Sequence, residues 1–380
     1  MAEKRYLLTP GPTPVPPQVL AALAEPIVHH RSPEFLPVYE QCLERLRTVC
    51  RTSSDVLLFT ASGTGAFESA VANLVSPGEP HLVVSSGNFG ERWAAMVAAY
   101  GGAVDHLRYA WGEIPSADDV RARLGESAAK AVWVVHSETS TGVVADVQAL
   151  AAAAAEHGAL VVVDAVSSLG AVPCETDAWG LDVVVSGSQK ALMTPPGLGL
   201  AAVSAAAAAA AGSSPRFYFD WERTRKAQAT LDAPFTPAVS LVSGLNVALG
   251  LLLDEGLEAA FDRHVRLGRA CRAGAKAMGL ELFSPDDDSS AVVTAIRAPA
   301  GIDGTDVVRI LGDRFGITIA NGQADLKGKI FRIGHIGWFD VFDIVTALSA
   351  VELALSELGA EIERGVAVTS ALEAFEHARV

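Results

Sequence analysis

The stretch Ser186-Gly187-Ser188-Gln189-Lys190 decides the fold prediction. It follows the apolar run Leu181–Val185, which is typical of a buried strand, and it precedes Pro195-Pro196-Gly197. A lysine directly after a buried strand is costly unless its amine has a function. A desolvated amine loses its proton easily and can attack an aldehyde.

An acid stands at the end of a second apolar run, one crossover connection earlier: Asp164 follows Leu160–Val163. This pair suits pyridoxal 5'-phosphate (PLP). The lysine would form a Schiff base with the aldehyde, and the acid would keep the pyridine nitrogen protonated, so that the ring can accept electrons. Each residue also has an ordinary explanation, because acids and lysines are common at strand ends as caps and ion pairs.

The composition narrows the class of protein. The chain has 380 residues, of which 50% are hydrophobic and 19% charged, as in a large globular α/β enzyme. The net charge of −15 comes without a basic stripe, which argues against nucleic acid or an anionic membrane as the main partner. The four cysteines show no metal or redox spacing, so we expect free thiols and no metal site. No signal-peptide core follows the polar segment Met1–Tyr6, and no apolar stretch resembles a bilayer span, so we expect a cytoplasmic protein.

Strand-like and helix-like segments alternate over the first half of the chain. This pattern predicts a mostly parallel sheet covered on both faces, with ligands bound by the loops after the strands. The alanine-rich segment Ala201–Ala211 is interpreted as a helix, and the proline-rich segment Leu8–Pro17 as an extended arm or a disordered leader. The expected strands are Val56–Thr60, Leu82–Ser85, Val132–His136, Leu160–Asp164 and Val183–Ser186, and the expected helices are Ala66–Val75, Glu91–Tyr100 and Val147–His157.

The pattern changes in the last third. Two long helices, Val239–Glu255 and Leu257–Ala277, lead to an acidic loop, after which short strands and amphipathic helices follow. We therefore expect an α/β fold: an arm over residues 1–15, a large domain with the mostly parallel sheet over 16–260, and a smaller α+β domain over 261–380. The strands expected there are Ala291–Ile296, Ile317–Ala320 and Ile330–Ile333, and the helices are Asp306–Phe315 and Phe339–Leu358.

A glycine-rich turn is the candidate phosphate site. Ser62-Gly63-Thr64-Gly65 follows a predicted strand and opens a helix, where free N–H groups and the helix dipole favour an anion. The alternative is an ordinary glycine-rich turn. Glu68 stands where a dinucleotide fingerprint requires its third glycine, so that motif is excluded.

Three further positions have candidate roles. Phe89 follows a strand and could stack on a flat heterocycle, or belong to the core. The polar loop of residues 136–142 could contact a cofactor oxygen or the substrate, or be a solvated turn, and His136 could be catalytic or simply end its strand. Arg332 lies in a strand-like apolar run, where it needs either a substrate carboxylate or an internal acid.

Taken together, these stretches resemble the class V, fold-type I PLP-dependent aminotransferases, in particular the alanine–glyoxylate and serine–glyoxylate (serine–pyruvate) group. The resemblance spans nearly the whole chain. It is carried by Gly11-Pro12-Thr13-Pro14, Ser62-Gly63-Thr64-Gly65, His136-Ser137-Glu138-Thr139-Ser140-Thr141-Gly142, Asp164-Ala165-Val166-Ser167-Ser168, Ser186-Gly187-Ser188-Gln189-Lys190 and Arg332-Ile333-Gly334-His335.

The resemblance implies a homodimer with active sites at the subunit interface. It makes Lys190 and Asp164 the catalytic pair, with Phe89 stacked on the ring and Thr139 beside the ring oxygen. Arg332 would bind the substrate's α-carboxylate. The implied phosphate ligands are Ser62, Gly63, Thr64, Gln189 and, from the neighbouring subunit, Thr236. Two positions depart from the mammalian alanine–glyoxylate enzymes: Phe89 replaces a tryptophan, and no tyrosine occurs within Leu231–Thr236.

The implied reaction is ping-pong transamination, in which Lys190 moves the proton between the donor's α-carbon and the cofactor. No arginine for a second carboxylate is evident, so we expect alanine or serine as donor and glyoxylate or pyruvate as acceptor. A high rate with aspartate or glutamate would contradict this. Alternatives within the class are ureidoglycine–glyoxylate and 2-aminoethylphosphonate–pyruvate transamination.

Other classes are less favoured. Gln189, where cysteine desulfurases have histidine, disfavours that related chemistry. A hydrogenase accessory subunit is disfavoured, because no cysteine cluster could ligate an iron–sulfur centre. A non-catalytic PLP-binding protein is disfavoured as well, because Lys190, Asp164 and Arg332 occur together.

Overall fold

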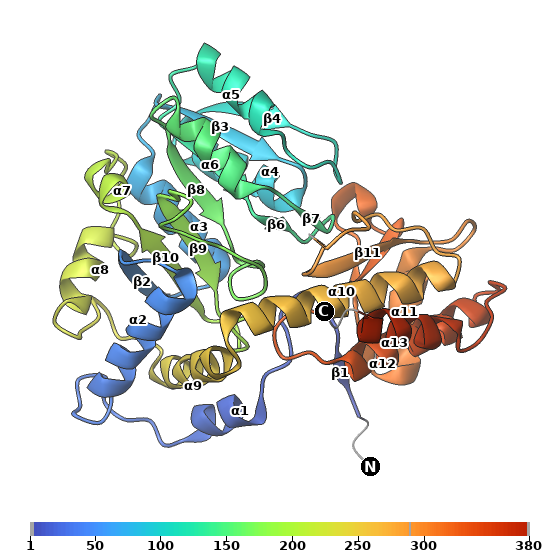
Figure 1. Cartoon of the computed structure of the whole chain (residues 1–380). Coiled ribbons are helices and arrows are strands. Elements are labelled where there is room, and N and C mark those ends of the chain that lie inside the picture. Colours follow the sequence, from blue (N-terminus) through green and yellow to red (C-terminus); the bar gives the residue numbers. More distant parts are fainter. Residues whose placement is uncertain (1–3, 289, 378–380) are drawn as a thin grey trace.

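A seven-stranded sheet forms the centre of the larger part of the molecule (Figure 1). The computed structural model describes residues 4–288 and 290–377. The strand order is β2-β10-β9-β8-β5-β3-β4, and all strands are parallel except β10, which is antiparallel to both of its neighbours. The strands are β2 (Asp55–Thr60), β3 (Pro80–Ser85), β4 (Ala103–Arg108), β5 (Ala131–Val135), β8 (Leu160–Asp164), β9 (Val183–Gly187) and β10 (Leu198–Val203).

Helices cover both faces of this sheet, which explains why its central strands are nearly continuous valine, leucine and alanine runs. Alternate residues of one strand enter different cores: Val162 packs with one set of helices and Val163 with the other. Val163 shares its core with α2 (Leu36–Cys50), α5 (Ala117–Glu126), α6 (Val147–Ala155) and α9 (Val239–Glu255). Val162 shares its core with α3 (Gly63–Leu74), α4 (Asn88–Ala99), α7 (Ala205–Ala209) and α8 (Trp221–Gln228).

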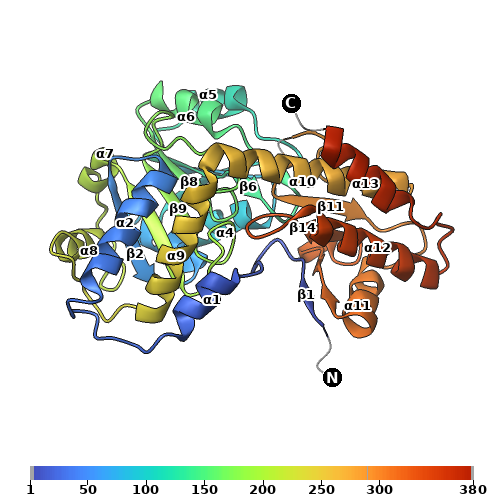
Figure 2. The same ribbon diagram turned by 60° about the horizontal axis from the view of Figure 1, so that its bottom comes forward.

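A smaller antiparallel sheet lies beside the first, in the order β11-β14-β13, with its own apolar cluster (Figure 2). The chain's first strand, β1 (Tyr6–Leu7), pairs with β12 (Ile317–Thr318) of this later region. The N-terminal segment therefore joins the two parts; α1 (Pro17–Ala24) follows it and packs on α9. The remaining elements are β6 (Ser137–Glu138), β7 (Val143–Val144), β11 (Val293–Arg297), β13 (Ala320–Asn321), β14 (Ile330–Gly334), α10 (Leu257–Ala277), α11 (Gly304–Phe315), the 3₁₀ turn η1 (Ala324–Leu326), α12 (Val341–Glu357) and α13 (Val366–His377).

The α/β class and the mostly parallel sheet are confirmed, but two predicted elements are only partly correct. Of the expected helix Ala201–Ala211, the part Ala205–Ala209 is the helix α7, whereas Ala201–Val203 is the end of strand β10. Alanine favours helices, but here its small side chain fits a strand buried on both faces, and packing outweighs propensity. The expected strand Ile317–Ala320 is divided at Ile319, because its two halves pair with β1 and β14 in different sheets.

The expected division into domains stays a prediction. Its boundary between residues 260 and 261 falls inside the continuous helix α10. Residues 1–3 of the expected arm and 378–380 of the expected small domain lie outside the described residues.

Within residues 4–288 and 290–377, no single helix has the length and hydropathy of a membrane span. The pair α9 and α10, bent by 86° at their junction, reaches those values only when counted together, on length and composition alone.

Candidate active site

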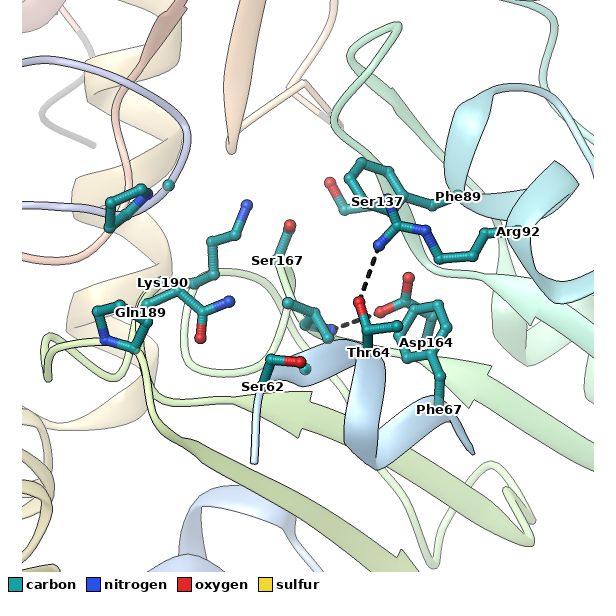
Figure 3. A pocket seen from close by; sticks show the side chains of 15 residues that line it. Ser62, Thr64, Phe67, Phe89, Arg92, Ser137, Asp164, Ser167, Gln189 and Lys190 are labelled. Atoms are coloured by element: carbon teal, nitrogen blue, oxygen red, sulfur yellow. Dashed lines mark hydrogen bonds between the residues drawn. The ribbon is translucent and has the colours of Figure 1, made fainter. Parts of the chain in front are cut away.

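A cavity of about 270 Å³ opens at the carboxyl ends of the central strands (Figure 3). The loops after β2, β3, β5, β8 and β9 all contribute to it, and Gly11 and Pro12 of the N-terminal segment complete its wall. The convergence expected from the sequence is therefore observed. Seven of the ten candidate residues line the cavity: Ser62, Gly63, Thr64, Phe89, Asp164, Gln189 and Lys190.

Lys190 is buried at the end of the tight turn that follows β9, with 8% of its surface exposed. Its Nζ donates a hydrogen bond to the carbonyl of Pro10 at 2.7 Å, and its own carbonyl accepts one from Thr13 Oγ1 at 2.9 Å. Burial lowers the pKa of Lys190 to about 8, although the nearby Asp164 carboxyl opposes that shift. The N-terminal segment thus holds an amine that is readily deprotonated.

Asp164 ends β8 and is 4% exposed. Its Oδ1 accepts a hydrogen bond from the backbone N–H of Val166 at 2.8 Å. Burial raises the pKa of Asp164 to about 8, and the charge of Glu138 adds to this rise, whereas Lys190 and Arg92 oppose it. A cationic N–H placed against this carboxyl would stabilise its ionised form.

The glycine-rich turn begins helix α3, as the sequence predicts. Ser62 is the N-cap, and its Oγ accepts a hydrogen bond from the N–H of Gly65 at 3.2 Å. Gly63 is tightly enclosed: a Cβ there would approach Val166 Cγ2 to 3.0 Å. Because the N–H of Gly65 is already bound, the N–H groups of Gly63 and Thr64 are the ones of the first helical turn that face an anion site.

Phe89 is half-buried at the start of α4, and its ring lies under the guanidinium of Arg92, with Cζ 4.7 Å from the ring centroid. Arg92 Nη1 also donates to Thr64 Oγ1 at 3.0 Å (Figure 3). The sequence analysis missed Arg92, although its position three residues after Phe89 on a helix places both on one face.

Arg332 lies on β14, 4% exposed, and Thr139 is 1% exposed. The two are in contact, because Arg332 Nη1 donates to the carbonyl of Thr139 at 2.6 Å. Nε and Nη2 donate to the carbonyl of Asn321 at 3.0 and 2.7 Å. Among the residues that the structure describes, no acid forms an ion pair with Arg332, and neither Arg332 nor Thr139 lines the cavity.

Thr236 is exposed and lies in a separate shallow groove near the end of β2. In the same groove, Tyr218 stacks on Phe235 at 4.9 Å between ring centroids. The segment Leu231–Thr236 contains no tyrosine, but Tyr218, which is distant in sequence, lies beside it.

Ser137 and Ser167 also line the cavity and were not singled out from the sequence. Ser137 lay within a loop that was considered only as a whole. His136 is buried and does not line the cavity, and burial lowers the pKa of its ring to about 4.

The polar groups of the cavity fit PLP. Ser137 Oγ and Gln189 Oε1 are buried and have no hydrogen-bond partner within residues 4–288 and 290–377, which is rare unless a ligand or water completes the site. The cavity also offers an anion site at α3, a half-buried aromatic ring, a buried acid and a lysine with a lowered pKa. These correspond to the phosphate, ring face, ring nitrogen and aldehyde of that cofactor.

Comparison with known proteins identifies the family. The model of the class V aminotransferase family matches residues 5–330, so the chain belongs to that family. Enzymes of this class and fold depend on PLP. The chain is therefore a PLP-dependent transaminase, with an amino acid and an oxo acid as its classes of substrate.

Individual relatives carry different names. The chain is 44% identical to the soluble hydrogenase small subunit of Synechococcus sp. (strain PCC 6716), covering 94% of this chain and 95% of that one. It is 36% identical to the serine–glyoxylate aminotransferase of Methylorubrum extorquens (97% and 95% covered) and 35% identical to the L-aspartate–glyoxylate aminotransferase of Paracoccus denitrificans (98% and 96%). The solved ureidoglycine–glyoxylate aminotransferase of Bacillus subtilis superposes with a TM-score of 0.95 at 31% identity, covering 99% of both chains.

Proposed function

We propose that this chain transfers the amino group of alanine or serine to glyoxylate or pyruvate, with Lys190 and Asp164 as the catalytic pair. The observation that carries the proposal is that one cavity holds a buried lysine with a lowered pKa, a buried acid and an anion-binding helix start. When bound, PLP supplies an electron sink for the carbanion formed at the donor's α-carbon.

The chain's own groups have distinct proposed roles. Lys190, once free, takes the proton from the donor's α-carbon and returns it later, since burial lowers the pKa of its amine to about 8, within reach of physiological pH. Asp164 accepts a hydrogen bond from the pyridine N–H. Phe89 covers one ring face, and Ser62, Gly63, Thr64 and Gln189 hold the phosphate, with Thr236 of a second copy.

Arg332 and Thr139 form the proposed substrate side of the site. Arg332 is held by two backbone carbonyls, and among the described residues no acid forms an ion pair with it, although the charge of the nearby Glu138 partly offsets the effect of burial on its pKa. A carboxylate that approaches it would gain a charge-assisted hydrogen bond. The Thr139 side chain is proposed to lie by the cofactor's ring oxygen.

A dicarboxylate donor such as aspartate is the second candidate. The expectation of small donors rested on the lack of a second arginine, but Arg92 does line the cavity. We still favour small donors, because Arg92 already donates to Thr64 and lies against Phe89. The Paracoccus relative at 35% identity has aspartate in its name, which makes this alternative worth testing.

The test is an absorption spectrum of the purified protein with PLP, before and after adding one donor at a time without acceptor. We expect the visible band of the lysine-bound cofactor to bleach with alanine or serine, and aspartate to act much more slowly. Faster bleaching with aspartate, abolished in R92Q, would establish the second candidate instead. A protein that stays colourless with added PLP would overturn the proposed function.

Lys190→Ala should remove covalently bound PLP and lower turnover by about 10²- to 10⁴-fold. The matched control is Lys226→Ala, because Lys226 is exposed and pairs with Glu222 on its own helix. A cytoplasmic location also remains a proposal, which cell fractionation would test.

A further inference from the structure

Glu138 is a buried carboxylate close to the cavity, with 1% of its surface exposed. It lies on the two-residue strand β6, between the cavity residue Ser137 and Thr139. Its Oε2 accepts hydrogen bonds from the backbone N–H groups of Phe89 (2.9 Å) and Gly90 (3.1 Å). Its Oε1 accepts from the N–H and the hydroxyl of Ser140. Both oxygens are therefore used.

These contacts cap helix α4 from another part of the chain. The helix begins after Gly87 and has no side-chain cap of its own. Instead, its first N–H, from Asn88, donates to Ser140 Oγ at 3.0 Å, and the next two donate to Glu138. A carboxylate there satisfies free donors and complements the helix dipole.

Gly87 shows that the approach is close. A Cβ at this position would clash with Cγ of Glu138 and with Oγ of Ser140. Because the backbone at Phe89 is bound directly by the carboxylate, the position of the Phe89 ring over the cavity depends on Glu138.

The same segment holds Arg332, since the carbonyl of the next residue, Thr139, accepts from the guanidinium at 2.6 Å. Glu138 thus links Phe89 on α4 with the loop that contacts β14. It does not line the cavity, so its hydrogen bonds act through its neighbours, and its charge also raises the pKa of Asp164 in the cavity wall.

We propose that Glu138 is a positioning residue that sets the Phe89 ring against the cofactor. This inference rests on the proposed function, in which Phe89 stacks on PLP. A glutamine could not replace Glu138, because its NH₂ group would face N–H and O–H donors where an acceptor is needed.

The experiment is a double-mutant cycle with E138Q and F89L. The dissociation constant of PLP and the visible circular dichroism of the bound cofactor are measured for four holoproteins: wild type, both single variants and the double variant. We expect E138Q to weaken PLP binding about tenfold and to reduce the dichroism. In the F89L background, E138Q should add less than about threefold, because its effect passes through the ring.

The matched control is Glu91→Gln, in the first turn of the same helix but half-exposed and bound to Ser85 and Arg108. It should leave both readouts unchanged. An E138Q protein equal to wild type, or an effect of E138Q that is undiminished in F89L, would overturn the inference.

If E138Q does not fold, as judged by far-ultraviolet dichroism of the apoprotein, Gly87→Ala tests the same contact from the other side. It keeps the carboxylate but displaces it, and it should weaken PLP binding and dichroism in the same way; wild-type values would contradict the inference. A wild-type protein that fails to bind PLP would count against the proposed function and not against Glu138.

Discussion

Lys190 is constrained on both sides. Its amine donates to Pro10 and its side chain packs on Gly11, where a Cβ would clash with it and where φ is +141°, a value that disfavours other residues. Pro10 and Gly11, near the start of the chain, thus fix the position of the Lys190 amine, which is far away in sequence. Burial at this contact lowers the lysine's pKa, which leads to a prediction about pH.

We expect covalent uptake of PLP by the apoprotein to accelerate as pH rises through about 8 and to level off above it. The sign follows from the chemistry: below its pKa the amine is an ammonium without a free electron pair and cannot attack the aldehyde. The measurement is the rate of appearance of the visible band across a pH series. Asp164→Asn should move the midpoint to lower pH, since the Asp164 charge raises the pKa of Lys190. A midpoint near the ordinary value of 10.5 would contradict the prediction.

Arg332→Lys should lower kcat/KM for amino donors by about 10- to 100-fold, because lysine cannot maintain three directed donors towards two carbonyls and a carboxylate. Steady-state kinetics with alanine and serine provide the measurement. Arg309→Lys is the control, because Arg309 is exposed and pairs on its own helix. If loss of Arg332 spares donor binding and harms only the acceptor, the donor has no α-carboxylate, as in 2-aminoethylphosphonate.

At the scale of elements, α3 and α5 allow a matched comparison. Both begin at a serine whose Oγ accepts from the first turn: Ser62 for α3 and Ser116 for α5. Ser62→Ala and Ser116→Ala should each lower the free energy of unfolding by about 1 kcal/mol. Only Ser62→Ala should weaken PLP binding, by about tenfold, because Ser62 alone lines the cavity.

Urea unfolding of the apoproteins and titration with PLP measure the two effects separately. If the two serine variants bind PLP with equal affinity, Ser62 is not a phosphate ligand, whatever the stabilities of the variants.

For the whole molecule, several apolar side chains remain exposed near Thr236. Phe217 is 65% exposed, and both Phe217 and Tyr218 pack against Phe235. Exposed aromatic clusters of this kind are typical of interfaces. We therefore propose that this surface pairs two copies and brings Thr236 to the neighbouring cavity.

We expect the wild-type protein to be a dimer in analytical ultracentrifugation. The Phe217→Glu variant should be a monomer and should bind PLP more weakly. Subunit mixing is the sharper test. Mixed dimers of Lys190→Ala and Thr236→Ala chains would contain one wild-type site and one doubly changed site, so activity should rise above that of either variant. No recovery in proven mixed dimers would place Thr236 outside the neighbour's site.

Local patterns in the sequence determined the parallel core and most of its active-site edge. Strands that are buried on both faces must be apolar runs, and the carboxyl ends of parallel strands lie at one edge of the sheet. The sequence therefore predicted that Asp164, Lys190 and the turn at Ser62 lie close together. Helices α9 and α10 were predicted at their observed bounds, since their apolar periodicity is local.

Only the tertiary structure decided the contacts between distant segments. The end of strand β10, Ala201–Val203, was predicted as the start of an alanine-rich helix, because its pairing with β2 and β9 on either side is not a local property. The support of Lys190 by Pro10, of Arg332 by Thr139 and of Phe89 by Glu138 joins groups far apart in the chain, which no local periodicity encodes. The sequence determined which chemical groups are present, because strand ends carry them. Packing decided which groups hold them in place, because burial and hydrogen bonding depend on the complete fold.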